Sequence, residues 1–144
     1  MFDNILVLCV GNICRSPVAE AFLKAELPGK SVRSAGLGAL VGHPADPTAQ
    51  TLASAEGLDL ADHRAQQVTP AMLGEADLIL VMSRDQRGQV RKLHPASGGK
   101  TMLLTHWLSG QPDIPDPYKK STEAFEHVHK QIVAAAEAWL PKLS

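Results

Sequence analysis

The sequence of 144 residues has few cysteines, few aromatic residues and no excess of charge. It contains two cysteines, its aromatic residues amount to 4%, and its formal net charge is -1. Because there is no basic excess to neutralise phosphates, a general binder of nucleic acid or of membrane surfaces is excluded. The early apolar run ILVLCV is too short to cross a bilayer, and Asp3 precedes it where a signal peptide carries basic residues. We therefore expect a cytoplasmic protein with reduced cysteines and no membrane insertion.

The length and composition are those of one ordinary globular domain. Hydrophobic residues make up 44% of the chain and charged residues 20%, which argues against disorder and against a fibrous protein. A chain of this length buries a core without disulfides. We found no repeat, linker or low-complexity tail, so one domain is expected over residues 1–144.

The pattern of apolar residues predicts alternating strands and helices. Strands are expected over residues 5–8, 31–34, 77–82 and 100–104, and helices over 16–27, 47–57, 69–76, 83–93 and 121–140. This alternation predicts an α/β fold: a single three-layer domain with a four-stranded parallel sheet flanked by helices. The core-facing residues expected on the first helix are Val18, Ala21, Phe22 and Ala25. Those expected on the last are Phe125, Val128, Ile132, Ala135 and Trp139.

Both cysteines lie in the stretch CVGNICRS, residues 9–16, between the first strand and the first helix. In parallel sheets ligands bind beyond the carboxyl ends of the strands, and a helix N-terminus directs N–H groups and positive potential at an anion. The spacing C-x5-R places Cys9 and Arg15 around one oxyanion, with the guanidinium as a two-pronged donor. The same potential favours the thiolate of Cys9, which is a nucleophile, and Ser16 can donate its hydroxyl to the sulfur.

A buried apolar Cys9 with a surface Arg15 is the alternative interpretation of this spacing. The position at a strand-to-helix turn and the following Ser-Pro favour the catalytic interpretation.

Two other kinds of site, a nucleotide-binding loop and a zinc site, are excluded. The GKS and GKT triplets lack the glycine of a nucleotide-binding loop, since Lys24 and His94 stand in its place. The cysteines would need two more zinc ligands and the histidines are scattered, so we expect no metal and no cofactor.

Phosphoryl transfer to a cysteine also needs an acid that protonates the leaving oxygen. The stretch DIPDPY offers Asp113 and Asp116 in a proline-rich loop just after a strand, and prolines on both sides fix the backbone of Asp116. Turn formation is the alternative role for either aspartate. Tyr118, the only tyrosine, is expected as an aromatic wall of the site, with simple packing as its alternative role.

The stretches CVGNICRSPVAEA, SAG, DHRAQQ and DPY together resemble the low-molecular-weight protein tyrosine phosphatases, and the match runs essentially end to end. The late IPDPYKKS and the stretch AGLGALVGHPADP are most similar to the bacterial branch that dephosphorylates tyrosine autokinases of capsule and exopolysaccharide export. The resemblance implies a phosphocysteine on Cys9, phosphate held by Arg15 and loop amides, and Asp116 as general acid and then base. The implied partner is a phosphotyrosine protein, a tyrosine autokinase, with inorganic phosphate as product.

The same resemblance implies further residues at the site. A supporting set of Asn12, Ser16, Ser34 and His63 is expected to share hydrogen bonds that hold the loop. Leu40 is expected to form the wall opposite Tyr118, because relatives outside the branch often carry an aromatic residue where this chain has GALVG. The residues expected to contact substrate are Val10, Gly11, Asn12, Ile13, Cys14, Ser16, Leu40 and Tyr118.

Two other functions remain as alternatives, and one residue has two possible roles. An arsenate reductase on the same scaffold needs further cysteines, and none follows Cys14. A non-catalytic phosphotyrosine-binding module would not need the nucleophile and the acid, which are both present. Cys14 either packs as a small apolar residue or forms a disulfide with Cys9 after oxidation, and the sequence does not choose between the two.

Overall fold

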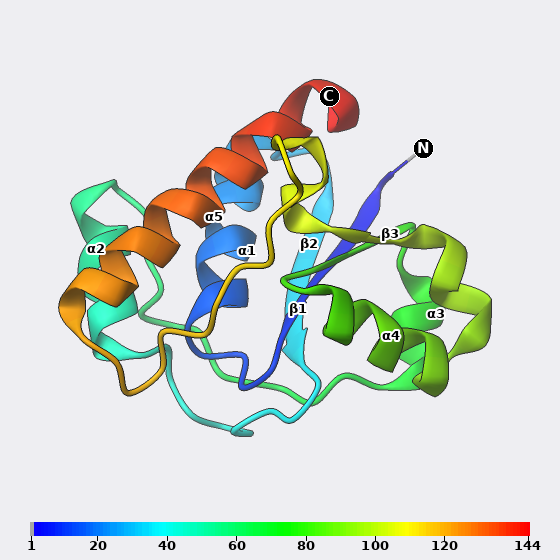
Figure 1. Ribbon diagram of the computed structural model, residues 1–144, viewed down its shortest axis with the longest axis horizontal. Helices are drawn as coiled ribbons and strands as arrows, with labels where there is room; N and C mark the ends of the chain where they lie inside the picture. Colours follow the sequence, from blue (N-terminus) through cyan, green and yellow to red (C-terminus); the bar gives the residue numbers. More distant parts are fainter. Residues whose placement is uncertain (1) are drawn as a thin grey trace.

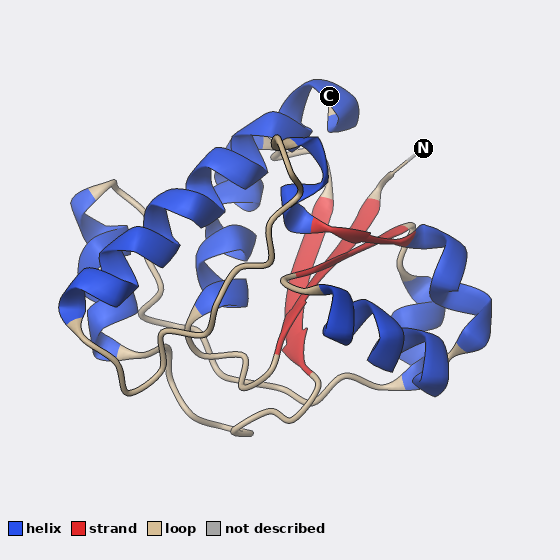
Figure 2. Ribbon diagram, viewed as in Figure 1, coloured by secondary structure: helices blue, strands red, loops and turns tan. Residues whose placement is uncertain are grey.

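Short, unbroken apolar runs form the central strands of the sheet, as expected where both faces of a parallel sheet are covered. The computed structural model describes residues 2–144. Its strands are β1 (Asn4–Cys9), β2 (Ser31–Gly36), β3 (Leu78–Val81) and β4 (Thr101–Leu103). All pairings are parallel, in the order β2-β1-β3-β4. The predicted four-stranded parallel sheet is confirmed (Figure 2).

Helices cover both faces of this sheet and make the three predicted layers (Figure 1). On one side lie α1 (Arg15–Glu26), α2 (Pro47–Ala55) and α5 (Thr122–Leu143), and on the other α3 (Pro70–Glu75) and α4 (Arg84–Leu93). Short 3₁₀ helices, η1 (Pro95–Lys100) and η2 (Leu104–Trp107), flank β4. Side-chain oxygens cap four of these helices by accepting from backbone N–H groups; they belong to Asp46, Thr69, Ser83 and Ser121.

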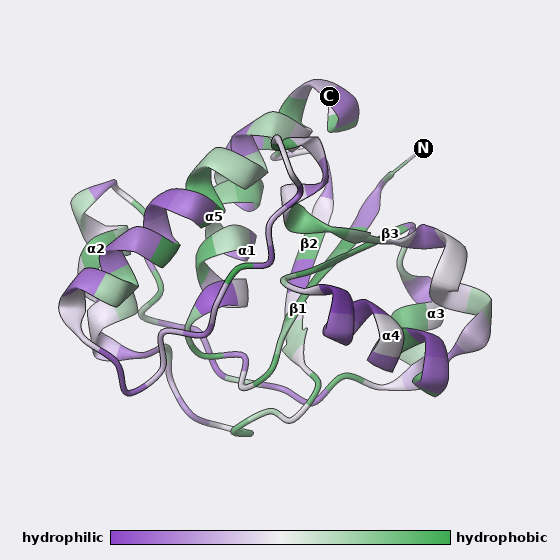
Figure 3. Ribbon diagram, viewed as in Figure 1, coloured by the Kyte–Doolittle hydropathy of each residue, from purple (hydrophilic) through white to green (hydrophobic). Residues whose placement is uncertain are grey.

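The alternation of side chains along β1 divides the core in two. Ile5 and Val7 belong to the cluster under α1 and α5, whereas Leu6 and Leu8 belong to the cluster on the α3 and α4 side. Away from the sheet the helices are more polar, and α4 is hydrophilic along most of its length (Figure 3). All the residues predicted for the core face of α5 are buried.

The predicted core face of α1 is wrong in part. Ala25 is exposed and Leu23 is fully buried in its place, while Ala21 and Phe22 are half-buried. The reason is that the first turn of α1 buries polar residues, Arg15 and Ser16, which a search for apolar residues at helical spacing ignores.

The strand order decides where a ligand can bind. The chain leaves β1 for α1 and β2 on one side, and β3 lies on the other side of β1. The carboxyl end of β1 is therefore the point where the strand order reverses, which is where open α/β sheets bind ligands. Within residues 2–144, no helix is both long enough and apolar enough to cross a membrane.

Candidate active site

The loop between β1 and α1, which we call the cysteine loop (residues 9–15), joins the two ends of the C-x5-R spacing. Cys9 is the last residue of β1 and Arg15 the first of α1, with exposed fractions of 2% and 4%. Asn12 in the middle has a φ of 60°, in the left-handed region that asparagine tolerates better than most residues. The sequence thus places an asparagine where the turn needs that conformation.

The backbone carbonyls of the cysteine loop are held by groups outside it. Backbone N–H groups of Leu37, Gly38 and Leu40 donate to the carbonyls of residues 9, 10 and 11, over 2.9 to 3.1 Å. His63 Nε2 donates to the carbonyl of residue 12 at 2.6 Å, and Asp46 N to that of residue 13 at 2.9 Å. In a trans peptide the N–H points opposite to the carbonyl. The amides of residues 10–14 are therefore directed away from these partners and toward the inside of the loop.

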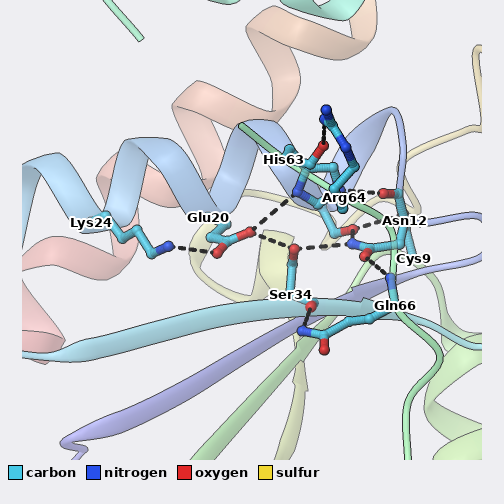
Figure 4. A network of polar contacts seen from close by, with 9 residues as sticks. Cys9, Asn12, Glu20, Lys24, Ser34, His63, Arg64 and Gln66 are labelled. Atoms are coloured by element: carbon cyan, nitrogen blue, oxygen red, sulfur yellow. Dashed lines mark hydrogen bonds and ion pairs between the residues drawn. The ribbon is translucent and has the colours of Figure 1, made fainter. Parts of the chain in front are cut away.

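The hydrogen bonds of Asn12 fix the direction of the bonds around it (Figure 4). Asn12 Oδ1 accepts from Gln66 N at 2.9 Å, so Nδ2 is the donor to Ser16 Oγ at 2.8 Å and to Ser34 Oγ at 3.0 Å. Each hydroxyl accepts from Asn12 and has its own proton left to donate. Ser16 can therefore donate to Cys9 Sγ, 2.9 Å away, and Ser34 donates to Glu20 Oε1 at 2.5 Å.

Glu20 closes this network on the side away from the sulfur (Figure 4). Its Oε2 lies 2.8 Å from Lys24 Nζ and its Oε1 lies 3.9 Å from His63 Nδ1. Asn12, Ser16 and Ser34 are almost fully buried, with exposed fractions of 0%, 0% and 2%. Their polar atoms have partners, so the network holds the cysteine loop without a desolvation penalty for unpaired groups.

The loop between η2 and α5 brings the predicted acid to Arg15. Arg15 Nη1 donates to the carbonyl of Ile114 at 2.8 Å, and Nη2 lies 3.7 Å from Asp116 Oδ2. Ile114 N in turn donates to the carbonyl of Met82 at 2.8 Å, which ties this loop to the end of β3. Asp113 instead accepts from Arg84 N and Nη1, both at 3.1 Å.

A cavity of about 140 Å³ opens over the cysteine loop. Asp116 is the only carboxylate that lines it within the described part of the chain. Leu40 and Tyr118 come from two different loops, and Tyr118 is 39% exposed at the cavity. The residues that line it are Cys9, Val10, Gly11, Ile13, Cys14, Arg15, Gly38, Leu40, Asp116 and Tyr118.

Cys14 differs from Cys9 in its surroundings. Burial is the main cause that raises the pKa of the Cys14 thiol above its ordinary value of 9.0, and the nearby carboxylates of Asp46 and Asp116 raise it further. At neutral pH Cys14 is therefore a protonated thiol. Both cysteines are free.

Comparison with known proteins agrees with this geometry. The sequence profile of the low molecular weight phosphotyrosine protein phosphatases matches residues 4–144. The chain belongs to this family. The enzyme class expected from the sequence, a protein-tyrosine phosphatase, is thereby confirmed.

The similar proteins include several bacterial phosphatases. The probable low molecular weight protein-tyrosine-phosphatase AmsI of Erwinia amylovora is 49% identical over 100% of this chain and 99% of its own length. The crystal structure of the tyrosine phosphatase Wzb from Escherichia coli K30 in complex with sulphate has a TM-score of 0.96 at 46% identity and covers 100% of both chains. The YwlE arginine phosphatase from Geobacillus stearothermophilus has a TM-score of 0.89 at 31% identity, over 96% of this chain and 91% of its own. These similarities confirm that the chain belongs to the bacterial branch of the family that contains AmsI and Wzb.

The structure of this phosphatase gathers most of the predicted site residues in one place. The side chains of Asn12 and Ser16 do not line the cavity and lie buried behind the loop, so a contact of Asn12 with substrate would come from its backbone N–H. Ser34 and His63 lie in the supporting network, where they were expected. The predicted contact residues that line the cavity are Val10, Gly11, Ile13, Cys14, Leu40 and Tyr118.

Three participants were missed by the sequence analysis. Glu20 lies one helical turn after Ser16 on α1, and this spacing was the available signal. Gln66 belongs to the stretch DHRAQQ, which was noted as a motif without a role for this residue. The carbonyl of Ile114 could not be predicted from the sequence, because every residue has the same backbone carbonyl.

Proposed function

We propose that this phosphatase hydrolyses phosphotyrosine through a covalent phosphocysteine on Cys9. One observation carries the proposal: Cys9, Arg15 and Asp116 line the same cavity, over a loop whose amides point inward. Inward N–H groups at a helix N-terminus suit the oxygens of a phosphate. Arg15 Nε is buried and has no hydrogen-bond partner within residues 2–144, so this donor is available to a substrate oxygen.

In the first step the Cys9 thiolate attacks phosphorus from below, and the bond from phosphorus to the aryl oxygen breaks. Asp116 gives its proton to that leaving oxygen, which departs as a phenol. The loop amides and Arg15 stabilise the charge on the equatorial oxygens. The products of this step are the free phenol and a phosphocysteine.

In the second step Asp116, now a carboxylate, takes a proton from water, and the water oxygen attacks phosphorus. The bond from phosphorus to sulfur breaks and inorganic phosphate leaves. Ser16 is placed to donate to Cys9 Sγ at 2.9 Å, which stabilises the thiolate that departs. The network around Asn12 keeps this hydroxyl proton directed at the sulfur.

The walls of the cavity favour an aromatic ester. Leu40 and Tyr118 supply apolar surface beside the deep Cys9, and a phenyl ring is long enough to reach from this rim to the loop. A phosphoarginine substrate would bring a guanidinium into the cavity. Asp116, the only carboxylate that lines the cavity within residues 2–144, already lies 3.7 Å from Arg15, so the lining favours phosphotyrosine.

The proposed partner is a phosphotyrosine protein in the cytoplasm, and among such proteins a tyrosine autokinase of exopolysaccharide or capsule export. Support comes from the similarity to the bacterial phosphatases and from the motifs that first indicated this branch. A nucleophilic thiol also requires a reducing compartment.

The test compares wild type with Cys9→Ser on matched peptides that carry phosphotyrosine, phosphoserine or phosphoarginine. We expect wild type to release phosphate from the phosphotyrosine peptide far faster than from the other two. Cys9→Ser should lose nearly all turnover while its circular dichroism and thermal unfolding stay close to those of wild type. Activity retained by Cys9→Ser would refute the nucleophile, and comparable rates on the three peptides would refute the substrate class.

A further inference from the structure

One wall of the cavity is formed by a loop that lies outside the helices and strands. The wall segment (residues 37–42) follows β2 and carries Gly38 and Leu40, which line the cavity. On its inner side, its N–H groups donate to the carbonyls of the cysteine loop. The position of Leu40 relative to Cys9 therefore depends on what holds the outer side of this segment.

A single side chain holds the outer side at its centre. Gln67 Oε1 accepts from Ala39 N at 2.9 Å, and Gln67 Nε2 donates to the carbonyl of Leu37, also at 2.9 Å. On either side of this contact the two chains are joined by backbone hydrogen bonds instead. Val68 N donates to the carbonyl of Gly36 at 3.0 Å, and Gly42 N donates to the carbonyl of Ala65 at 2.9 Å. The amide of Gln67 thus replaces a strand partner where the two chains separate.

From residue 38 to residue 40 the N–H groups of the wall segment alternate between its two sides, as in a strand. Leu37 N, Gly38 N and Leu40 N face the cysteine loop, whereas Ala39 N and the carbonyl of Leu37 face Gln67. Without the Gln67 amide these two groups would have water as their partner, and the segment would gain freedom to move away from the cavity.

We propose that Gln67 is a positioning residue that sets the affinity of the cavity for the aromatic part of the substrate. It acts through Leu40, which it holds against the cavity by clamping the wall segment on both sides of Ala39. Its effect on the phosphate is expected to be smaller, because Arg15 and the amides of residues 13 and 14 are held by groups outside the wall segment, namely the carbonyl of Ile114, His63 and Asp46 N. The inference rests on the proposed function of the cavity as an aryl phosphate site.

Gln67 is exposed, so a substitution there leaves the core unchanged. The test uses Gln67→Leu, which keeps a similar shape and removes both hydrogen bonds. Two competitive inhibitors are compared with p-nitrophenyl phosphate as substrate: inorganic phosphate, which reaches only the cysteine loop, and benzylphosphonate, which also places a ring between the walls. We expect the inhibition constant of benzylphosphonate to rise about three- to tenfold, as for the loss of one or two hydrogen bonds. That of phosphate should change less than about twofold.

A second experiment tests whether the effect passes through Leu40. In a Leu40→Ala background, Gln67→Leu should add little to the inhibition constant of benzylphosphonate, because the side chain that it positions is gone. The matched control is Gln89→Leu, which removes a surface glutamine whose amide donates to Asp85 on its own helix, α4, at 2.8 Å. This control should leave both inhibition constants unchanged.

Three results would overturn the proposal. Unchanged affinity for benzylphosphonate in Gln67→Leu would show that the clamp is dispensable. An equal loss for both inhibitors would place its effect on the cysteine loop instead. Full additivity with Leu40→Ala would show that it does not act through Leu40. If Gln67→Leu folds poorly, Gln67→Glu serves instead, since it accepts from Ala39 N but cannot donate to the carbonyl of Leu37. The proposed function is tested separately by the turnover of p-nitrophenyl phosphate by wild type. If wild type hydrolyses this substrate, the three results above overturn only the role of Gln67.

Discussion

Asp113 and Asp116 are the same residue type in the same proline-rich loop, and the structure gives them different surroundings. Asp113 is bound by Arg84 at the start of α4, which fixes the loop. Asp116 lines the cavity, accepts from Tyr118 N at 3.1 Å through Oδ1, and directs Oδ2 toward Arg15. These surroundings support Asp116 as the acid and Asp113 as a structural residue.

Asp116→Asn is expected to slow phosphotyrosine far more than p-nitrophenyl phosphate. The nitrophenolate leaves without a proton, whereas the tyrosine oxygen needs one, and general acid help is worth about 10²- to 10⁴-fold. Steady-state rates on both substrates measure the contrast. Asp113→Asn is the control and should reduce both rates by a similar, smaller factor. Equal losses on both substrates in Asp116→Asn would remove it from the role of acid.

Cys14 shares the cavity with Cys9 and keeps its proton at neutral pH. Oxidation of Cys9 by peroxide gives a sulfenic acid, and attack of a neighbouring thiolate on its sulfur forms a disulfide and releases hydroxide. The raised pKa of Cys14 limits the thiolate available for this step, so the step should become faster as pH rises from neutral toward 9.

Brief treatment with peroxide followed by dithiothreitol should restore most of the activity of wild type. Cys14→Ser should keep its initial turnover and recover much less, because its Cys9 sulfenic acid has no partner and oxidises irreversibly. Recovery in wild type should also be larger when the peroxide step is run at pH 9 than at pH 7. Equal recovery in both proteins would leave Cys14 as a packing residue.

At the scale of elements, the close approach of the wall segment to the cysteine loop requires a glycine at the end of β2. A Cβ on Gly36 would overlap the carbonyl oxygen of Val10 and lie 3.0 Å from Ala39 Cα. Gly36 also pairs with Gln67 in a parallel β-bridge. The two segments that hold the wall segment, the cysteine loop and residues 63–67, therefore both contact Gly36. The contact with backbone atoms leaves no side chain that could move aside.

Gly36→Ala should destabilise the fold by about 1–3 kcal/mol, since backbone must shift to admit the methyl group. It should also raise KM for aryl phosphates by moving the wall. Urea unfolding and steady-state kinetics measure the two effects. Gly29→Ala is the matched control, because a Cβ there meets nothing within 4 Å. Similar stability of the two variants would contradict the packing argument.

At the scale of the whole molecule, parallel topology gathers segments that are far apart in the chain. Four segments meet near the carboxyl ends of β1, β2 and β3: the cysteine loop, the wall segment, residues 63–67 and residues 113–118. In the proposed mechanism these segments supply, in this order, the nucleophile, a wall, the support and the acid. No group of three or more His, Cys, Asp or Glu side chains within residues 2–144 is placed to hold a metal ion.

We expect turnover to be independent of metal ions. Dialysis against EDTA is expected to leave the rate on p-nitrophenyl phosphate unchanged, because Arg15 and the loop amides supply the positive charge that the reaction needs. Added magnesium or zinc should not increase the rate. Loss of activity with EDTA and its return with a divalent ion would contradict the mechanism.

The sequence by itself determined the class of fold and the enzyme family, and it supplied the residues of the proposed chemistry. Alternating strands and helices require a parallel sheet, and such a sheet binds ligands beyond the end of β1, where the C-x5-R stretch lies. The features that carried this prediction are local: Cys9, Arg15 and the helix that follows are within a few residues of one another. Local spacing survives folding because the strand-to-helix turn is itself local.

Only the tertiary structure decided which residues meet across long distances in the chain. The residues by themselves offered both Asp113 and Asp116, the resemblance selected Asp116, and no role was assigned to Glu20 and Gln67. Their roles depend on hydrogen bonds to backbone groups or to side chains from other elements, such as the pair that Gln67 makes with the wall segment. A backbone carbonyl or N–H is the same at every residue, so sequence cannot specify its partner before the chain has folded.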